Sequence, residues 1–223
     1  MKVVTFFLFS LATSLLFGQQ ALKPGAPIPE FNLMHLDGNH YQVSNIVDGK
    51  YRLPKGYIFV FLGDSCRISR SYEKRLIAMH DKYTPKGYPV VAFSSSKDFF
   101  RLRKRAEKLG INYFYLLDRD GEAAKAFGAT QTATAFVFHR DKGLLYSGAI
   151  DDDPRTIRGV TINYIEATLH AVKLKENLPF EFVAGSGCSL ETGKEIVRMD
   201  MPKEATTNAS ENYGSGGKAT RDQ

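Results

Sequence analysis

Apolar residues along this chain form two kinds of pattern, short continuous runs and stripes with helical spacing. Continuous runs are typical of strands buried on both faces of a parallel sheet, and they occupy residues 57–62, 88–93, 113–117, 135–138 and 144–148. Helical patterns separate these runs, at residues 68–83, 98–109, 122–127 and 162–174. Because strands and helices alternate, the pattern predicts an α/β fold around a mixed central sheet.

The N-terminal residues depart from this pattern. Lys2 precedes a mostly apolar stretch, Val3 to Phe17, and the small residue Gly18 follows it. This arrangement is typical of a secretory signal peptide. We therefore expect residues 1–18 to be removed from a protein exported to the periplasm or the exterior of a bacterial cell, with a membrane anchor as the alternative. The stretch is short for a bilayer span, so no stable membrane insertion is expected after cleavage.

One domain is expected over residues 19–191. The chain of 223 residues is 43% hydrophobic, which is an ordinary composition for a protein with a packed core. Residues 192–223 are polar and show no periodicity, which predicts a disordered tail. The net charge of +6 is modest and spread along the chain, so no nucleic-acid partner is expected.

The chain has only two cysteines, Cys66 and Cys188, and it contains no Cys-x-x-Cys or His-x-x-x-His motif. We therefore expect neither a metal site nor a cofactor. Cys66 follows a buried run and the turn Gly63-Asp64-Ser65, and it precedes the first long helix. A helix N-terminus stabilises a thiolate; Arg67 would add to this effect and Asp64 would oppose it. Cys66 is therefore the candidate nucleophile, and Cys188 is its candidate partner in an oxidising compartment.

Several segments together resemble a known family. The matching residues are Pro29–Leu33, Asp37-Gly38, Phe59–Cys66, Ser71–Leu76, Tyr115–Asp118, Ala124–Thr130, Phe136–Phe138, Tyr146–Asp152 and Gly187-Cys188-Ser189. Their order and spacing resemble the thioredoxin fold in its redoxin form, which includes alkyl hydroperoxide reductases, thiol-specific antioxidant proteins and exported thiol–disulfide oxidoreductases. The resemblance covers about residues 24–191. It implies a three-layer α/β/α sandwich and oxidoreductase or antioxidant activity. The Asp37-Gly38 turn between two short alternating runs independently predicts an N-terminal β-hairpin.

The sequence departs from the family pattern at the expected site. Gly63 stands where a redox member has the first cysteine of Cys-x-x-Cys, and Ala133 stands where it has a cis-proline. A cis peptide before a non-proline residue costs about 2.5–4 kcal/mol, so a trans bond is expected at Ala133. We expect six residues to line the site around the two cysteines, namely Gly63, Asp64, Ser65, Arg67, Thr132 and Ala133.

Two hypotheses follow for the cysteines. In the first, Cys66 attacks a protein disulfide or a peroxide, and Cys188 resolves the product. In the second, the domain is a non-catalytic binding or structural module whose cysteines are inert or permanently bridged. The two cysteines can form a disulfide without backbone movement only if their Cα atoms lie within about 7 Å. Glu73, on the helix after Cys66, is expected to pair with a basic neighbour on the same helix rather than to relay a proton.

Overall fold

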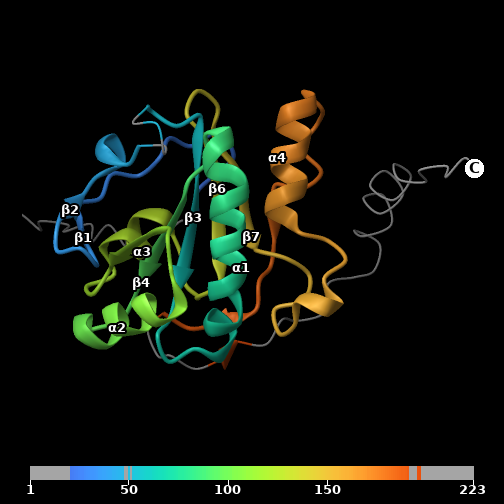
Figure 1. Ribbon diagram of the computed structural model, residues 1–223. Coiled ribbons are helices and arrows are strands. Elements are labelled where there is room, and N and C mark those ends of the chain that lie inside the picture. The colour runs from blue at the N-terminus through green and yellow to red at the C-terminus, as the bar shows by residue number, and fades with distance from the viewer. Residues whose placement is uncertain (1–20, 48–49, 51, 191–194, 197–223) are drawn as a thin grey trace, which may run out of the picture.

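The computed structural model describes residues 21–47, 50, 52–190 and 195–196. The predicted signal peptide, residues 1–18, lies outside the described residues, as does the predicted tail except for residues 195–196. The described residues form one α/β unit built around a central sheet, with helices packed on it (Figure 1).

The sheet has eight strands in the order β2-β1-β5-β4-β3-β6-β7-β8. The strands are β1 (Leu33–His35), β2 (His40–Tyr41), β3 (Gly56–Leu62), β4 (Val90–Ser94), β5 (Phe114–Leu117), β6 (Thr134–His139), β7 (Gly143–Ala149) and β8 (Phe182–Val183). Strands β3, β4 and β5 pair in parallel, whereas β6 pairs antiparallel with both β3 and β7. The predicted mixed sheet is therefore confirmed, and so is the N-terminal hairpin, formed by β1 and β2.

Helices cover both faces of the sheet. They are α1 (Arg67–Tyr83), α2 (Phe99–Leu109), α3 (Glu122–Phe127) and α4 (Tyr164–Leu174). Buried side chains of α1, α2 and α4 belong to the core on one face, and those of α3 belong to the core on the other. In Figure 1, α1 and α4 stand on the same side of the sheet. The three-layer α/β/α arrangement is confirmed.

The central strand β3 explains why its sequence shows no alternation of apolar and polar residues. Ile58, Val60 and Leu62 pack in the core beneath α1. The intervening aromatic residues pack in the opposite core, where the Phe59 ring stacks on that of Phe93 with a centroid separation of 5.6 Å. Because both faces of β3 are covered, every residue of the strand is buried.

The C-terminal end of β3 is where the chain brings together its two cysteines. Cys66 lies in the turn between β3 and α1, at the lower end of α1 in Figure 1. Two short strands, β9 (Gly187–Cys188) and β10 (Glu195–Ile196), pair antiparallel at the other end of the chain. These two strands were not predicted, and β10 falls within the segment that was expected to be a disordered tail.

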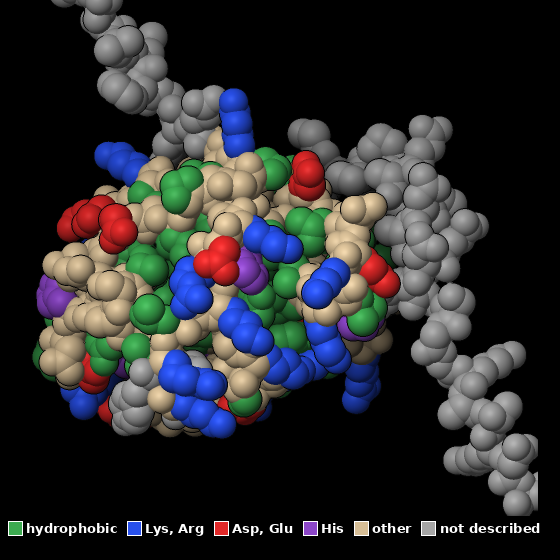
Figure 2. Space-filling model, turned by 90° about the horizontal axis from the view of Figure 1, so that it is seen from above, with side chains coloured by type: hydrophobic (Ala, Val, Ile, Leu, Met, Phe, Trp, Pro, Cys, Tyr) green, Lys and Arg blue, Asp and Glu red, His purple; other side chains and the backbone are tan. Residues whose placement is uncertain are grey.

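The surface seen from above in Figure 2 carries many Lys and Arg side chains, interspersed with apolar and acidic groups. This face lies at the end of α1 away from Cys66 (Figures 1 and 2). In the part of the chain that the structure describes, no helix has the length and apolarity needed to cross a membrane.

Candidate functional site: a buried disulfide at a helix N-terminus

Cys66 and Cys188 form a disulfide bond although 122 positions separate them in the sequence. Their Cα atoms lie 5.9 Å apart, within the usual range for a disulfide. Both residues are buried, Cys66 with 2% and Cys188 with 5% of its surface exposed. The sequence left open whether the two cysteines pair, and the structure pairs them.

Cys66 is the N-cap residue of α1, directly before its first helical residue, Arg67. Its backbone is extended, its N–H donates to the Gly63 carbonyl at 3.1 Å, and its own carbonyl accepts from the Arg70 N–H at 3.1 Å. The first turn of this helix, which spans 17 residues, contains no acidic residue. Free N–H groups and the partial positive charge at this end stabilise an anionic sulfur once the disulfide opens.

Thr132 contacts both cysteines. Its hydroxyl donates to Cys66 Sγ at 3.2 Å and accepts from the Cys188 N–H at 2.9 Å, and its own N–H donates to the Cys188 carbonyl at 2.8 Å. Thr132 is itself buried. One side chain therefore fixes the position of the disulfide and supplies a hydrogen bond to the sulfur at the helix N-terminus.

The segment of residues 185–190, here called the C-terminal strap, lies along the loop that precedes β6. Gln131 and Ser189 form an antiparallel bridge. On either side of that bridge, the Thr132 N–H donates to the Cys188 carbonyl and the Leu190 N–H donates to the Thr130 carbonyl, at 2.8 and 3.0 Å. The strap places Cys188 beside Cys66 by backbone pairing as well as by the covalent bond.

Two glycines allow this close packing. A Cβ added at Gly63 would lie 2.8 Å from the Thr132 Cγ2 atom and 3.2 Å from the Cys66 Cβ atom. A Cβ added at Gly187 would lie only 1.9 Å from the Thr132 carbonyl oxygen. The space that a side chain at position 63 would need is therefore occupied by the side chain of Thr132, and Cys188 supplies the second sulfur from the strap.

Ala133 occupies the position expected for the cis-proline. No peptide bond among the described residues is cis, so the expected trans bond at Ala133 is confirmed. Its φ angle is 56°, a left-handed value that is unusual for a residue with a side chain. The Ala133 N–H donates to the Phe61 carbonyl at 2.6 Å, a hydrogen bond that proline could not make.

The remaining site residues lie in the turn before α1 and at its first position. Asp64 pairs with Arg101 of α2, and its carboxylate also accepts from the Ser96 hydroxyl at 3.3 Å. Ser65 and Arg67 are exposed. The negative charge of Asp64 is thus compensated by Arg101, which limits its opposition to a thiolate at Cys66.

Glu73 is buried and pairs with Arg105 of α2, whose Nε atom donates to Glu73 Oε1 at 2.7 Å. The expected pairing within α1 was therefore wrong, because α1 packs closely enough on α2 for a bidentate interaction between Glu73 and Arg105.

The Glu73 carboxylate also affects a neighbouring tyrosine. Burial raises the pKa of Tyr115, and the nearby carboxylate of Glu73 raises it further.

A second polar cluster near the site was not predicted. The Tyr72 hydroxyl donates to Asp151 Oδ1 at 2.7 Å, and Arg75 donates to Asp151 Oδ2 at 2.8 Å. Burial raises the pKa of Asp151, although the hydrogen bonds from Tyr72 and Arg75 oppose the shift. Tyr72 belongs to the apolar stripe of α1, and Asp151 lies within a segment that resembled the family, but nothing in the sequence indicated that they meet.

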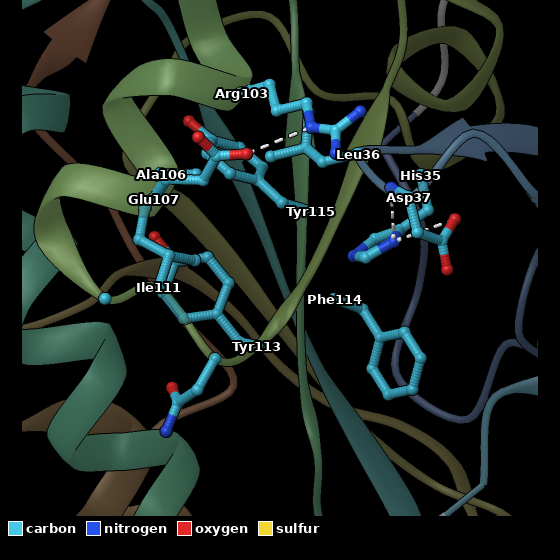
Figure 3. A pocket seen from close by; sticks show the side chains of 12 residues that line it. His35, Leu36, Asp37, Arg103, Ala106, Glu107, Ile111, Tyr113, Phe114 and Tyr115 are labelled. Atoms are coloured by element: carbon cyan, nitrogen blue, oxygen red, sulfur yellow. Dashed lines mark hydrogen bonds and ion pairs between the residues drawn. The ribbon is translucent and has the colours of Figure 1, made fainter.

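Two cavities differ in their relation to the disulfide. A small one of about 10 Å³, lined by Tyr72, Ala133 and Ser186 among others, has room for about one water molecule beside the strap. A hollow of about 360 Å³ lies between the β1–β2 hairpin and α2, and neither cysteine lines it (Figure 3). Among the described residues, no group of three or more His, Cys, Asp and Glu side chains is arranged to hold a metal ion.

The fold and the cysteine turn place this chain among the thioredoxin-fold redoxins. The model of the AhpC/TSA family matches residues 24–147, more than half of the chain. The chain therefore belongs to the AhpC/TSA family.

Individual relatives are distant. The chain is 22% identical to the thiol-disulfide oxidoreductase ResA of Geobacillus thermodenitrificans (strain NG80-2) over 121 residues, which cover 54% of this chain and 66% of that protein, just under two thirds. A crystal structure of an uncharacterized conserved protein from Geobacillus kaustophilus is 27% identical and aligns with a TM-score of 0.66, covering 75% of this chain and 91% of that one.

A third relative supports the fold. A structure described as the thiol:disulfide interchange protein DsbE from Chlorobium tepidum aligns with a TM-score of 0.51 at 20% identity, covering 58% of this chain and 86% of that one. The thioredoxin-like fold inferred from the sequence is confirmed.

Proposed function

We propose that this protein is an exported thiol–disulfide oxidoreductase in which Cys66 and Cys188 form the redox pair. The observation that carries the proposal is the disulfide between a cysteine at a helix N-terminus and a cysteine on a strap held by a few hydrogen bonds. Export rests on the apolar N-terminal stretch after Lys2, and a disulfide is stable in the oxidising compartments to which such a signal leads.

The exchange reaction uses two thiols of a partner protein. One partner thiolate attacks Cys188 Sγ, a sulfur–sulfur bond forms to the partner, and Cys66 leaves as a thiolate. The second partner thiolate then attacks the partner sulfur of this mixed disulfide, and Cys188 leaves. Two electrons pass from the partner dithiol to this protein, whose cysteines take up two protons, and the partner becomes a disulfide.

The structure favours Cys66 as the first leaving group. Its sulfur accepts a hydrogen bond from the Thr132 hydroxyl and lies at the N-terminus of α1. Both features stabilise a developing thiolate, and a better-stabilised leaving thiolate departs faster. Cys188 has no such helix behind it, because it lies on the short strand β9.

Peroxide is a second oxidant that the reduced pair could use. The Cys66 thiolate would attack one peroxide oxygen and become a sulfenic acid, while the other oxygen leaves as an alcohol or water. Cys188 would then attack the Cys66 sulfur, and water would leave as the disulfide forms. The pairing of Cys188 with Cys66 supports this route, because the resolving thiol stands beside the sulfenic acid.

A permanently bridged module is the competing function, and the burial of both sulfur-bearing residues is the observation that favours it. The test is turnover of the wild-type protein with a reduced thioredoxin-type dithiol donor and either a protein disulfide or a peroxide. We expect the wild-type protein to turn over repeatedly and Cys66→Ser to be inactive. Cys188→Ser should react with one equivalent of the protein disulfide and stop there, because Cys66 forms a mixed disulfide that no second thiol releases. A wild-type disulfide that the donor never reduces, with no turnover of either substrate, would establish the structural role.

A further inference from the structure

The C-terminal strap occupies the place where an extended strand from another protein could pair. The strap forms an antiparallel bridge between Gln131 and Ser189, with one backbone hydrogen bond on each side of it. If the strap left, the Thr132 N–H and the Thr130 carbonyl would be an unpaired edge directly beside Cys66. Such an edge accepts a further strand, with the backbone giving affinity and the side chains giving specificity.

We infer that the loop at residues 130–133 docks an extended cysteine-bearing segment of a partner protein, that this segment carries a glycine directly before its cysteine, and that the C-terminal strap is an internal copy of it. The inference rests on the proposed function, since it assigns the partner that exchanges with Cys66. The strap shows how such a segment would bind, because it pairs with the loop at Gln131 and places Cys188 against Cys66.

The glycine requirement comes from the Thr132 carbonyl. A Cβ at the position of Gly187 would lie 1.9 Å from this oxygen, which is backbone and cannot move aside as a flexible side chain would. Two residues earlier the strap is more tolerant: a Cβ at Gly185 would meet its nearest atom, the Ala149 Cα, at an ordinary 3.5 Å. Of the two glycines in the strap, only Gly187, the residue before the cysteine, therefore lies where the loop excludes a side chain.

The strap also regulates access to the docking loop. Cys66 is 2% exposed while the strap is in place, so a partner strand reaches the sulfur only after the strap has moved. Attack on Cys188 by a first thiolate breaks the covalent link, so that only non-covalent contacts, among them three hydrogen bonds to residues 130–132, still join the strap to the loop. Reduction of the disulfide thus opens the same edge that the partner strand needs.

The test uses the full chain with a displaced strap. In Gly187→Ala/Cys188→Ser the alanine Cβ removes the strap from the loop, whereas Gly185→Ala/Cys188→Ser retains it and is the matched control. The peptide with the sequence of residues 184–190, AGSGCSL, is prepared with its cysteine as a mixed disulfide with thionitrobenzoate. The Cys66 thiolate attacks the peptide sulfur, the sulfur bond to thionitrobenzoate breaks, and the coloured thionitrobenzoate anion leaves.

We expect AGSGCSL to react with the displaced-strap variant at least about tenfold faster than AGSACSL, which has alanine before the cysteine; tenfold corresponds to about 1.4 kcal/mol. The control variant should react more slowly with both peptides. After unfolding in urea, the two peptides should react equally. Equal rates for the two peptides on the folded variant would overturn the inference.

A second arm separates this inference from the proposed function. The disulfide of thionitrobenzoate with itself, a small reagent that needs no docking, reports whether Cys66 reacts at all. If Cys66 reacts with it but does not discriminate between the peptides, only the docking inference fails. If Cys66 is inert towards it in both variants, the proposed function fails. Cys188→Ser alone, which needs no change in the strap glycines, should show the same preference between the peptides at a lower rate.

Discussion

Thr132 is the residue on which the geometry of the disulfide depends most. Its hydroxyl donates a hydrogen bond to Cys66 Sγ and accepts one from the Cys188 N–H. Its carbonyl oxygen leaves no room for a side chain at Gly187. Ala133, the next residue, holds a left-handed backbone conformation with its N–H bonded to the carbonyl of Phe61. These two residues set the conformation of the loop before β6 without a proline or a cis peptide bond.

We expect Thr132→Val to reduce the free energy of unfolding of the oxidised protein by about 1–3 kcal/mol, because it leaves the Cys188 N–H buried without a partner. The Cys66 thiolate also loses a donor, so reduction by a dithiol should slow. The control is Thr134→Val, which loses a half-buried hydroxyl bonded only to the Gln131 carbonyl. Urea unfolding and a stopped-flow reduction assay measure the two effects. The role assigned to Thr132 would be contradicted if both variants lost the same free energy of unfolding and both disulfides were reduced at the wild-type rate.

At the scale of elements, the packing of α1 on α2 depends on a buried ion pair that the sequence did not reveal. Glu73 on α1 is buried, and the guanidinium of Arg105 on α2 binds both of its carboxylate oxygens. The same packing brings Arg101 of α2 to Asp64, in the turn that carries Cys66. The position of α2 therefore affects the charge around the disulfide.

We expect Arg105→Met to reduce the free energy of unfolding by about 3 kcal/mol, because it leaves the Glu73 carboxylate buried and unpaired. Arg103→Met, on the same helix, removes an exposed pair with Glu107 and should cost at most about 0.5 kcal/mol. Urea unfolding of both variants measures the difference. If both variants lose the same free energy of unfolding, at most about 0.5 kcal/mol, the Glu73–Arg105 ion pair does not stabilise the packing of α2 on α1.

The elements that were predicted correctly are those whose sequence pattern reflects burial. The run Tyr57–Leu62 is continuous because both faces of β3 are covered, and the stripe through Ile68 and Tyr72 marks the face of α1 that packs on the sheet. In contrast, β9 has only two residues. Such a short strand, paired with the equally short β10, leaves no local pattern in the sequence.

The same limit applies to the site. The turn at Cys66 could be identified because strand, turn and helix follow each other directly in the sequence. The pairing of Cys66 with Cys188 could only be suggested. The two residues lie 122 positions apart, and the sequence indicates the pair only because the chain has no other cysteine. Asp151 and Tyr72 likewise meet only through the folded arrangement of β7, α1 and the loop that follows β7. Contacts of this kind depend on the tertiary fold.

At the scale of the whole molecule, the disulfide ties the C-terminal strap to the N-terminus of α1. Closing a loop of this length stabilises the folded protein by up to about 5 kcal/mol in the chain-entropy model. A redox role requires that the bond also opens without global unfolding. We expect the strap to move before the sheet opens, because three hydrogen bonds join it to residues 130–132, whereas β3 pairs with β4 over five residues and with β6 over six.

The urea dependence of the rate at which a reduced dithiol protein opens Cys66–Cys188 under native conditions tests this requirement most directly. The slope of such a dependence reports how much surface must be exposed before the reaction occurs. If movement of the strap alone exposes the disulfide, the logarithm of the rate should change little with urea below the unfolding transition. A slope equal to that of global unfolding would mean that the bond opens only in the unfolded chain, and it would identify Cys66–Cys188 as a purely structural bridge.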